Sequence, residues 1–133
     1  MAKERRLLVI SPHKAVWLPI VRGFKKTGWV VEAATNLAAG MRLFDANPMA
    51  YDLVVMDEDH GCENATSQHV LSGLLEIRCL NERCKVFLLI DSRERSKDEI
   101  KELRECTHAI LNKKDSLVEV FSRSARYFRY KVQ

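Results

Sequence analysis

Short apolar runs alternate with amphipathic segments along the whole chain. Each run is short, unbroken and rich in branched or aromatic side chains, which is typical of a strand buried on both faces. The segments between the runs repeat apolar positions at helical spacing, which predicts helices with one buried face. The predicted strands are Arg5–Ile10, Trp29–Ala33, the run from Tyr51 into Asp57, Lys85–Ile90 and Thr107–Leu111.

Turn and capping residues indicate where the intervening helices begin and end. Gly28 ends the first helix, and Ser96 with Glu99 forms a capping-box pattern at the start of the fourth. Ser116 with Glu119 repeats that pattern for the fifth. The predicted helices, with their inward residues, are 14–27 (Trp17, Val21, Phe24), one after Thr35 or Asn36 (Leu37, Met41, Phe44), 63–80 (Val70, Leu74, Ile77), one after Ser96 (Ile100, Leu103) and one after Ser116 (Leu117, Phe121, Ala125, Phe128).

The order of these elements predicts the fold class. Strand and helix alternate five times, with no internal repeat, linker or low-complexity stretch between them. Right-handed crossovers between such strands produce a parallel sheet with helices on both faces. We therefore expect an α/β fold with a doubly wound five-stranded parallel sheet of the flavodoxin-like (βα)5 type. A chain of 133 residues suits one domain, 1–133.

Chemistry is expected in the loops after the first, third, fourth and fifth strands. Ligands of doubly wound sheets bind outside the carboxyl ends of the strands. Asp57 is the sharpest candidate because it ends an unbroken apolar run, although an acid that merely ends a strand is the plain alternative. The four loops hold Ser11-Pro12-His13, Asp57-Glu58-Asp59, Asp91-Ser92 and Asn112-Lys113-Lys114.

An Asp after the third strand and a Lys after the fifth resemble the receiver (CheY-like) domains of two-component response regulators. The resemblance extends over the whole chain through its element order. It implies that Asp57 accepts a phosphoryl group from a histidine kinase and that Lys113 contacts the phosphoryl oxygens. Ser92 is implied as a further phosphoryl contact if its loop shifts. Fixed positive charge suits this chemistry, since a carboxylate must attack an anionic group.

The chain departs from the receiver pattern at the metal-binding acids. Receivers hold Mg²⁺ with an acidic pair directly after the first strand, where this chain has Ser11 and Pro12. Mg²⁺ prefers carboxylate oxygens, so we expect weak Mg²⁺ binding even if Asp59 partly substitutes, and we assign no metal or cofactor. Ile90 and Ile110 replace two further familiar site residues. This is the profile of a degenerate receiver, or pseudo-receiver.

The resemblance implies a signalling domain that works through protein contacts and is not an enzyme. Its partner would be a sensor kinase, an output domain or a second copy, which would meet the face formed by the fourth helix, fifth strand and fifth helix. A phosphorylation-independent scaffold, or the N-terminal regulatory domain of a transcriptional activator, stays open as an alternative. The candidate interface residues are Lys101, Arg104, Arg123 and Arg126.

Two other function classes share parts of this pattern. A flavin- or cobalamin-type binder shares this strand order, and His13 is similar to a cobalt-ligating histidine after a first strand. Val16 stands where that pattern expects glycine, however, and no glycine-rich phosphate loop follows. A metal-assisted hydrolase would need Asp57–His60 to converge on one ion, which consecutive residues rarely do.

Charge and composition limit the partners. The net charge is +4, and the basic residues gather near the two ends without forming one concentrated basic face, which argues against direct nucleic-acid binding. No apolar run approaches the ~18 residues of a membrane span. The four cysteines come without an apolar leader or a regular framework, so we expect reduced thiols and a cytoplasmic location.

Overall fold

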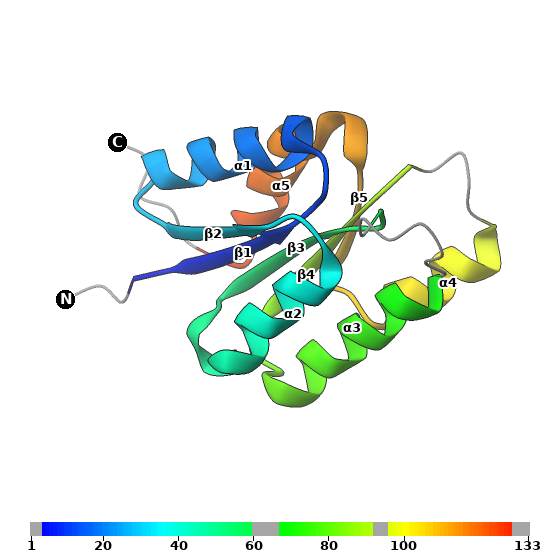
Figure 1. The fold of residues 1–133 in the computed structure, drawn as a ribbon. Helices are drawn as coiled ribbons and strands as arrows, with labels where there is room; N and C mark the ends of the chain where they lie inside the picture. The colour runs from blue at the N-terminus through cyan, green and yellow to red at the C-terminus, as the bar shows by residue number, and fades with distance from the viewer. Residues whose placement is uncertain (1–3, 60–66, 92–95, 129–133) are drawn as a thin grey trace.

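The computed structural model describes residues 4–59, 67–91 and 96–128. In this part of the chain, five strands form one parallel sheet in the order β2-β1-β3-β4-β5, with helices on both faces (Figure 1). The strands are β1 (Arg6–Ile10), β2 (Val30–Ala34), β3 (Leu53–Asp57), β4 (Lys85–Ile90) and β5 (Ala109–Asn112). The helices are α1 (Lys14–Lys26), α2 (Leu37–Ala46), α3 (Ser67–Leu80), α4 (Lys97–Glu105) and α5 (Ser116–Ser124), with 3-10 turns η1 (Pro48–Ala50) and η3 (Lys113–Asp115). The predicted doubly wound, flavodoxin-like fold is confirmed.

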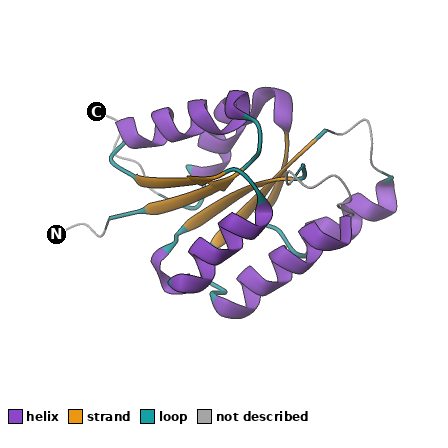
Figure 2. Ribbon diagram, viewed as in Figure 1, coloured by secondary structure: helices purple, strands orange, loops and turns teal. Residues whose placement is uncertain are grey.

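Alternate residues of the central strands enter two different hydrophobic cores, because successive side chains of a strand point to opposite faces. In β3, Leu53 and Val55 pack with residues of α1 and α5, whereas Val54 and Met56 pack with residues of α2, α3 and α4. Figure 2 shows these two helical layers on either side of the sheet. All four side chains are fully buried, which explains the unbroken apolar run. The helices of the described ranges are too short or too polar to cross a bilayer.

Helix α1 ends just before Gly28, as the sequence predicts. Gly28 has a φ of 90°, a left-handed conformation that glycine adopts without strain. Its N–H donates to the Lys25 carbonyl, and the Trp29 N–H donates to the Phe24 carbonyl, each at 3.1 Å. The Phe24 and Trp29 rings pack edge to face, 5.2 Å apart. These contacts form a Schellman motif, which turns the chain from α1 into β2.

Side-chain caps begin α2 and α4 as predicted. Asn36 Oδ1 accepts a hydrogen bond of 2.7 Å from the Ala39 N–H at the start of α2. Ser96 Oγ accepts one of 3.3 Å from the Glu99 N–H at the start of α4. Each cap satisfies a backbone donor that has no partner within its helix.

The capping box predicted at Ser116 is wrong. Ser116 is the first helical residue of α5 and is buried, and the N-cap is Asp115, which makes no side-chain cap hydrogen bond. The turn η3 runs directly into α5, and Asn112 caps η3 by accepting from the Lys114 N–H at 3.0 Å. The helical backbone therefore begins before Ser116, which leaves Ser116 no capping role.

The inward face of α5 also differs from the prediction, because Val120 and Ser124, which the pattern did not predict, are fully buried. Ala125 is exposed rather than buried, because α5 ends at Ser124 and Ala125 is already the C-cap. Phe128 is buried as expected, although it lies beyond the helix. Its ring packs edge to face on Trp29, with ring centroids 5.1 Å apart.

Candidate functional site

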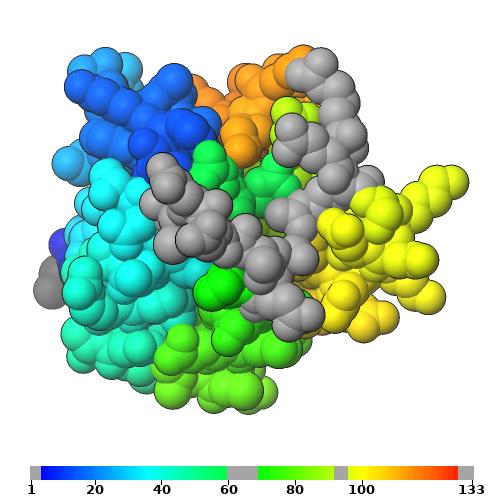
Figure 3. Space-filling model, turned by 45° about the vertical axis from the view of Figure 1, so that its right-hand side comes forward, coloured from blue at the N-terminus to red at the C-terminus, as the bar shows by residue number. Residues whose placement is uncertain are grey.

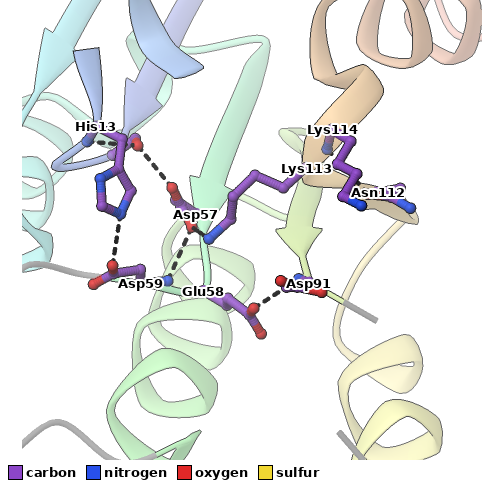
Figure 4. A network of polar contacts seen from close by, with 9 residues as sticks. His13, Asp57, Glu58, Asp59, Asp91, Asn112, Lys113 and Lys114 are labelled. Atoms are coloured by element: carbon purple, nitrogen blue, oxygen red, sulfur yellow. Dashed lines mark hydrogen bonds and ion pairs between the residues drawn. The ribbon is translucent and has the colours of Figure 1, made fainter. Parts of the chain in front are cut away.

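The candidate site lies at the carboxyl edge of the sheet. Ser11 directly follows β1, Asp57 ends β3 and Lys113 directly follows β5. Because all the strands are parallel, these positions reach the same edge. Figure 4 shows the Asp57 and Lys113 side chains pointing toward each other. The structure thus brings together the acid and the lysine that the sequence analysis singled out.

Asp57 is fully buried and both of its carboxylate oxygens are engaged. Oδ1 lies 2.7 Å from Lys113 Nζ and accepts a 2.9 Å hydrogen bond from the Asp59 N–H. Oδ2 accepts a 2.7 Å hydrogen bond from the Ser11 hydroxyl. An ion pair and hydrogen bonds together compensate the burial of the carboxylate.

Ser11 is held so that its single proton points at Asp57. Its side chain is fully buried, and its own N–H donates to the Ala34 carbonyl at 3.0 Å. Its hydroxyl oxygen accepts from the His13 N–H at 3.1 Å. A serine hydroxyl has only one proton to donate, and in this arrangement Asp57 receives it. The sequence placed Ser11 in a vestigial metal pocket but did not anticipate this bond.

A second pair of side chains, His13 and Asp59, lies beside the Asp57–Lys113 pair. His13 Nε2 lies 2.6 Å from Asp59 Oδ2, and each side chain is 49% exposed (Figure 4). His13 is also the N-cap residue of α1. The sequence analysis did not link these residues, which are 46 positions apart. The strand order could have predicted this contact. Because β1 lies next to β3, the residues that follow these two strands become neighbours.

The third acid of this loop points elsewhere. Glu58 Oε1 accepts a 2.7 Å hydrogen bond from the Asp91 N–H, at the end of β4. Asp59 meanwhile faces His13, so the acids Asp57, Glu58 and Asp59 diverge toward three different partners (Figure 4). His60 lies outside the described residues.

These residues do not fit the Mg²⁺ ion that the receiver resemblance implies. Ser11 contributes one neutral hydroxyl, already bonded to Asp57, and Pro12 has no side-chain donor atom. Asp59 Oδ2 is bonded to His13. Within residues 4–59, 67–91 and 96–128, no three His, Cys, Asp or Glu side chains are grouped to hold a metal ion. Mg²⁺ requires several oxygen ligands in a strict octahedral geometry, which this donor set lacks.

The predicted interface residues lie on α4, in the last turn of α5 and just beyond it. Lys101 and Arg104 are exposed on α4, and Arg126 is exposed just beyond α5. Arg123, in the last turn of α5, is partly exposed. Figure 3 shows α4, in yellow, standing out from the side of the molecule. Ser92 lies outside the described residues.

Comparisons with known proteins show similarity in fold but not in sequence. No family model matches the chain, and no curated protein matches it. A response regulator receiver domain protein from Clostridium thermocellum superposes with a TM-score of 0.67 at 19% identity, over 92% of this chain and 96% of that one. A CheY-like receiver domain protein from Methanospirillum hungatei gives 0.72 at 14% identity, over 93% and 96%.

A third solved structure is a response regulator from Burkholderia pseudomallei, described with a phosphorylated aspartic acid, a calcium ion and citrate. It gives a TM-score of 0.72 at 17% identity, over 90% of this chain and 66% of that one. The chain therefore has the fold of response regulator receiver domains.

Proposed function

We propose that this domain is a receiver-type signalling module that acts through protein contacts and does not depend on Mg²⁺-assisted phosphorylation. The observation that carries the proposal is the 2.7 Å hydrogen bond from the Ser11 hydroxyl to Asp57 Oδ2. With Lys113 and the Asp59 N–H on Oδ1, this bond gives both oxygens of the buried carboxylate a partner within the chain.

The electrostatics of phosphoryl transfer support this proposal. Transfer to a carboxylate needs positive charge against the attacking and transferred oxygens. Lys113 supplies one such charge, but Ser11 is neutral and already bonded to Asp57. Attack by Oδ2 would take place beside this neutral hydroxyl, inside a buried site. A domain with this pocket can still present a surface, because a contact face requires only the intact framework.

A phosphorylation switch at Asp57 is the second candidate. It is favoured by the 2.7 Å contact between Lys113 Nζ and Asp57 Oδ1, since a lysine there can hold phosphoryl oxygens. A solved structure of the same fold, from Burkholderia pseudomallei, is described with a phosphorylated aspartic acid. In this candidate, an Asp57 oxygen bonds to phosphorus as the bond between phosphorus and the donor's leaving group breaks.

The proposed partner face comprises α4, β5 and α5. Its partner is a sensor kinase, an output domain such as that of a transcriptional regulator, or a second copy of the chain. Lys101, Arg104 and Arg126 provide exposed positive charge there, interleaved along α4 with acids such as Asp98 and Glu102. Mixed charges favour a specific interface that weakens as salt rises.

Intact mass spectrometry after incubation with acetyl phosphate tests the proposal. We expect no phosphoryl mass on the wild-type domain, with or without Mg²⁺, and the same spectrum for Asp57→Asn. An added phosphoryl group that appears on the wild type and is absent from Asp57→Asn would establish the phosphorylation switch instead.

A Mg²⁺ titration tests the role of Ser11 separately. Calorimetry on the wild type should show no saturation at about millimolar Mg²⁺, because Ser11 and Pro12 offer no carboxylate. The variant Ser11→Asp/Pro12→Asp restores the acids that receivers carry and should bind Mg²⁺ measurably. Saturation of the wild type below that range would mean that other residues complete the metal site.

A further inference from the structure

The side chain of His108 takes part in the hydrogen-bond ladder between β4 and β5. The His108 N–H donates to the Val86 carbonyl at 2.9 Å. In return, the Val86 N–H donates to the imidazole Nδ1 of His108 at 3.0 Å. Val86 is fully buried in the core. A main-chain donor inside the sheet therefore depends on a titratable ring nitrogen, where a ladder ordinarily uses a backbone carbonyl.

The same histidine contacts the segment that follows α5, residues 125–128. The Tyr127 hydroxyl donates to the His108 carbonyl at 3.2 Å. The two rings pack edge to face, with centroids 5.8 Å apart. Phe87 of β4 also lies against Tyr127, at 5.9 Å between ring centroids. His108 thus connects β4, the start of β5 and the chain beyond α5.

The surroundings of His108 disfavour its protonated form. Among the described residues, the charged and titratable groups facing it are Lys85 on β4, Arg78 on α3 and the Tyr127 phenol. Burial, followed by the positive charges of Lys85 and Arg78, lowers the pKa of His108 below its ordinary value. The Lys85 ammonium also lies 5.3 Å from the centre of the Tyr127 ring. The neutral ring, with Nδ1 as acceptor, is the form that this environment selects.

We propose that protonation of His108 loosens residues 125–128, which follow α5, from β4 and the start of β5, so that this contact is a pH-sensitive latch. A protonated Nδ1 would oppose its own N–H to the Val86 N–H, and two donors cannot bond to each other. The ring must then turn away and lose the packing face that Tyr127 uses. The latch rests on this geometry and does not depend on the proposed function.

The direction of the pH dependence follows from linkage. The latched state binds the His108 proton more weakly than the released state, whose pKa is near the ordinary value of about 6.5. Latching is therefore fully favoured above that value and is lost progressively as the pH falls below it. We expect the segment to be docked at neutral pH and to open more often at about pH 5.

Amide hydrogen exchange followed by NMR tests the latch in the full chain. Protection factors are compared between pH 7.5 and 5.0. A protection factor is the ratio of the intrinsic to the observed exchange rate, so it is corrected for the effect of pH on the intrinsic rate. The amides of Val86 and Phe128 report the latch, and that of Leu8 in β1 reports global unfolding. In the wild type we expect the Val86 and Phe128 protection factors to fall about tenfold at the lower pH, while Leu8 is unchanged.

Two variants isolate His108 as the cause. His108→Asn places an amide oxygen near the position of Nδ1, so it keeps an acceptor but cannot titrate, and its protection should be independent of pH. His69→Asn alters an exposed histidine on α3 and should behave like the wild type. An equal fall in His108→Asn would overturn the proposal. A parallel fall at Val86, Phe128 and Leu8 would overturn it as well, since it would indicate global destabilisation.

Discussion

Asp57, Lys113 and Ser11 form a buried unit in which each member compensates the others. Lys113 reaches the carboxylate with only 21% of its side chain exposed, whereas Asp57 is completely enclosed. Among the described residues, removal of the lysine would leave the buried negative charge with the Ser11 hydroxyl and the Asp59 N–H as its partners. Removal of the acid's charge leaves a lysine that can extend into solvent. The two changes should therefore have unequal consequences.

We expect Lys113→Ala to lower the free energy of unfolding by about 2–3 kcal/mol, because it strands a buried carboxylate. Asp57→Asn should cost about 1 kcal/mol or less, since an amide keeps an acceptor for Ser11 and removes the charge. Urea denaturation monitored by tryptophan fluorescence measures both. Equal, negligible effects would mean that the Asp57–Lys113 contact contributes nothing to stability.

Two controls sharpen this comparison. Lys114→Ala removes a neighbouring lysine that is exposed, and it should change stability by no more than about 0.5 kcal/mol. The double variant Asp57→Asn/Lys113→Ala should be more stable than Lys113→Ala alone, because the stranded charge is gone. Strict additivity of the two single effects would argue against a direct interaction.

Helix α2 approaches β1 closely at a glycine. A Cβ on Gly40 would lie 2.6 Å from Ile10 Cγ1 and would also meet Ile10 Cδ1. Ile10 is fully buried in the core beneath α2, so it has little room to move. At Gly73, on α3, the nearest side-chain atom to an added Cβ is Leu37 Cδ1 at 3.3 Å. Of these two glycines, Gly40 is therefore required by packing, whereas Gly73 has more room for a side chain.

We predict that Gly40→Ala destabilises the domain by about 1–2 kcal/mol. Overpacking against Ile10 should exceed the ~1 kcal/mol that alanine gains over glycine in helix propensity. Gly73→Ala makes the same chemical change with more room and should be neutral or slightly stabilising. Thermal melts followed by circular dichroism decide between them. An increase in Tm for Gly40→Ala would show that Ile10 can repack.

The molecule as a whole separates its pocket from its proposed partner face. Asp57 is enclosed at the carboxyl edge of the sheet, whereas the exposed charges of the proposed face lie on α4 and just beyond α5. A domain that signals through its surface should therefore tolerate changes inside the pocket. Its signalling should be sensitive to the charges at the end of α5, because charges at an interface control how fast two proteins associate and which partner is bound.

In cells that depend on this protein, we predict that Asp57→Asn retains most signalling output. Charge reversal in Arg123→Glu/Arg126→Glu should abolish output by disrupting the interface. Lys25→Glu/Lys26→Glu is the matched control, since it makes the same change in net charge at exposed positions of α1. The measurement is the downstream output in a deletion background, with protein level checked for each variant.

The opposite result is equally informative. If Asp57→Asn is inactive and the α5 variant remains active, signalling depends on phosphorylation of Asp57. Loss of output in the α1 control as well would point to net charge rather than to a specific face.

Much of this architecture follows from local patterns. The unbroken apolar run that ends in Asp57 predicts a strand buried on both faces, and its end places the acid at the edge of the sheet. Asn36 and Ser96 begin helices because their side chains satisfy nearby backbone donors, an interaction contained within a few residues. Lys113 could be placed beside Asp57 because parallel strands end at one edge. These inferences need only short-range chemistry and the order of the elements.

Other contacts depended on the folded sheet. The bond from Ser11 to Asp57 and the pairing of His13 with Asp59 each join residues 46 positions apart, and they form because β1 lies beside β3 in a fixed register. The use of a His108 ring nitrogen by the Val86 N–H depends likewise on the pairing of β4 with β5. A hydrogen bond requires atoms within a few tenths of an ångström of ideal placement. Residue type and spacing cannot specify such distances until the strands have packed together.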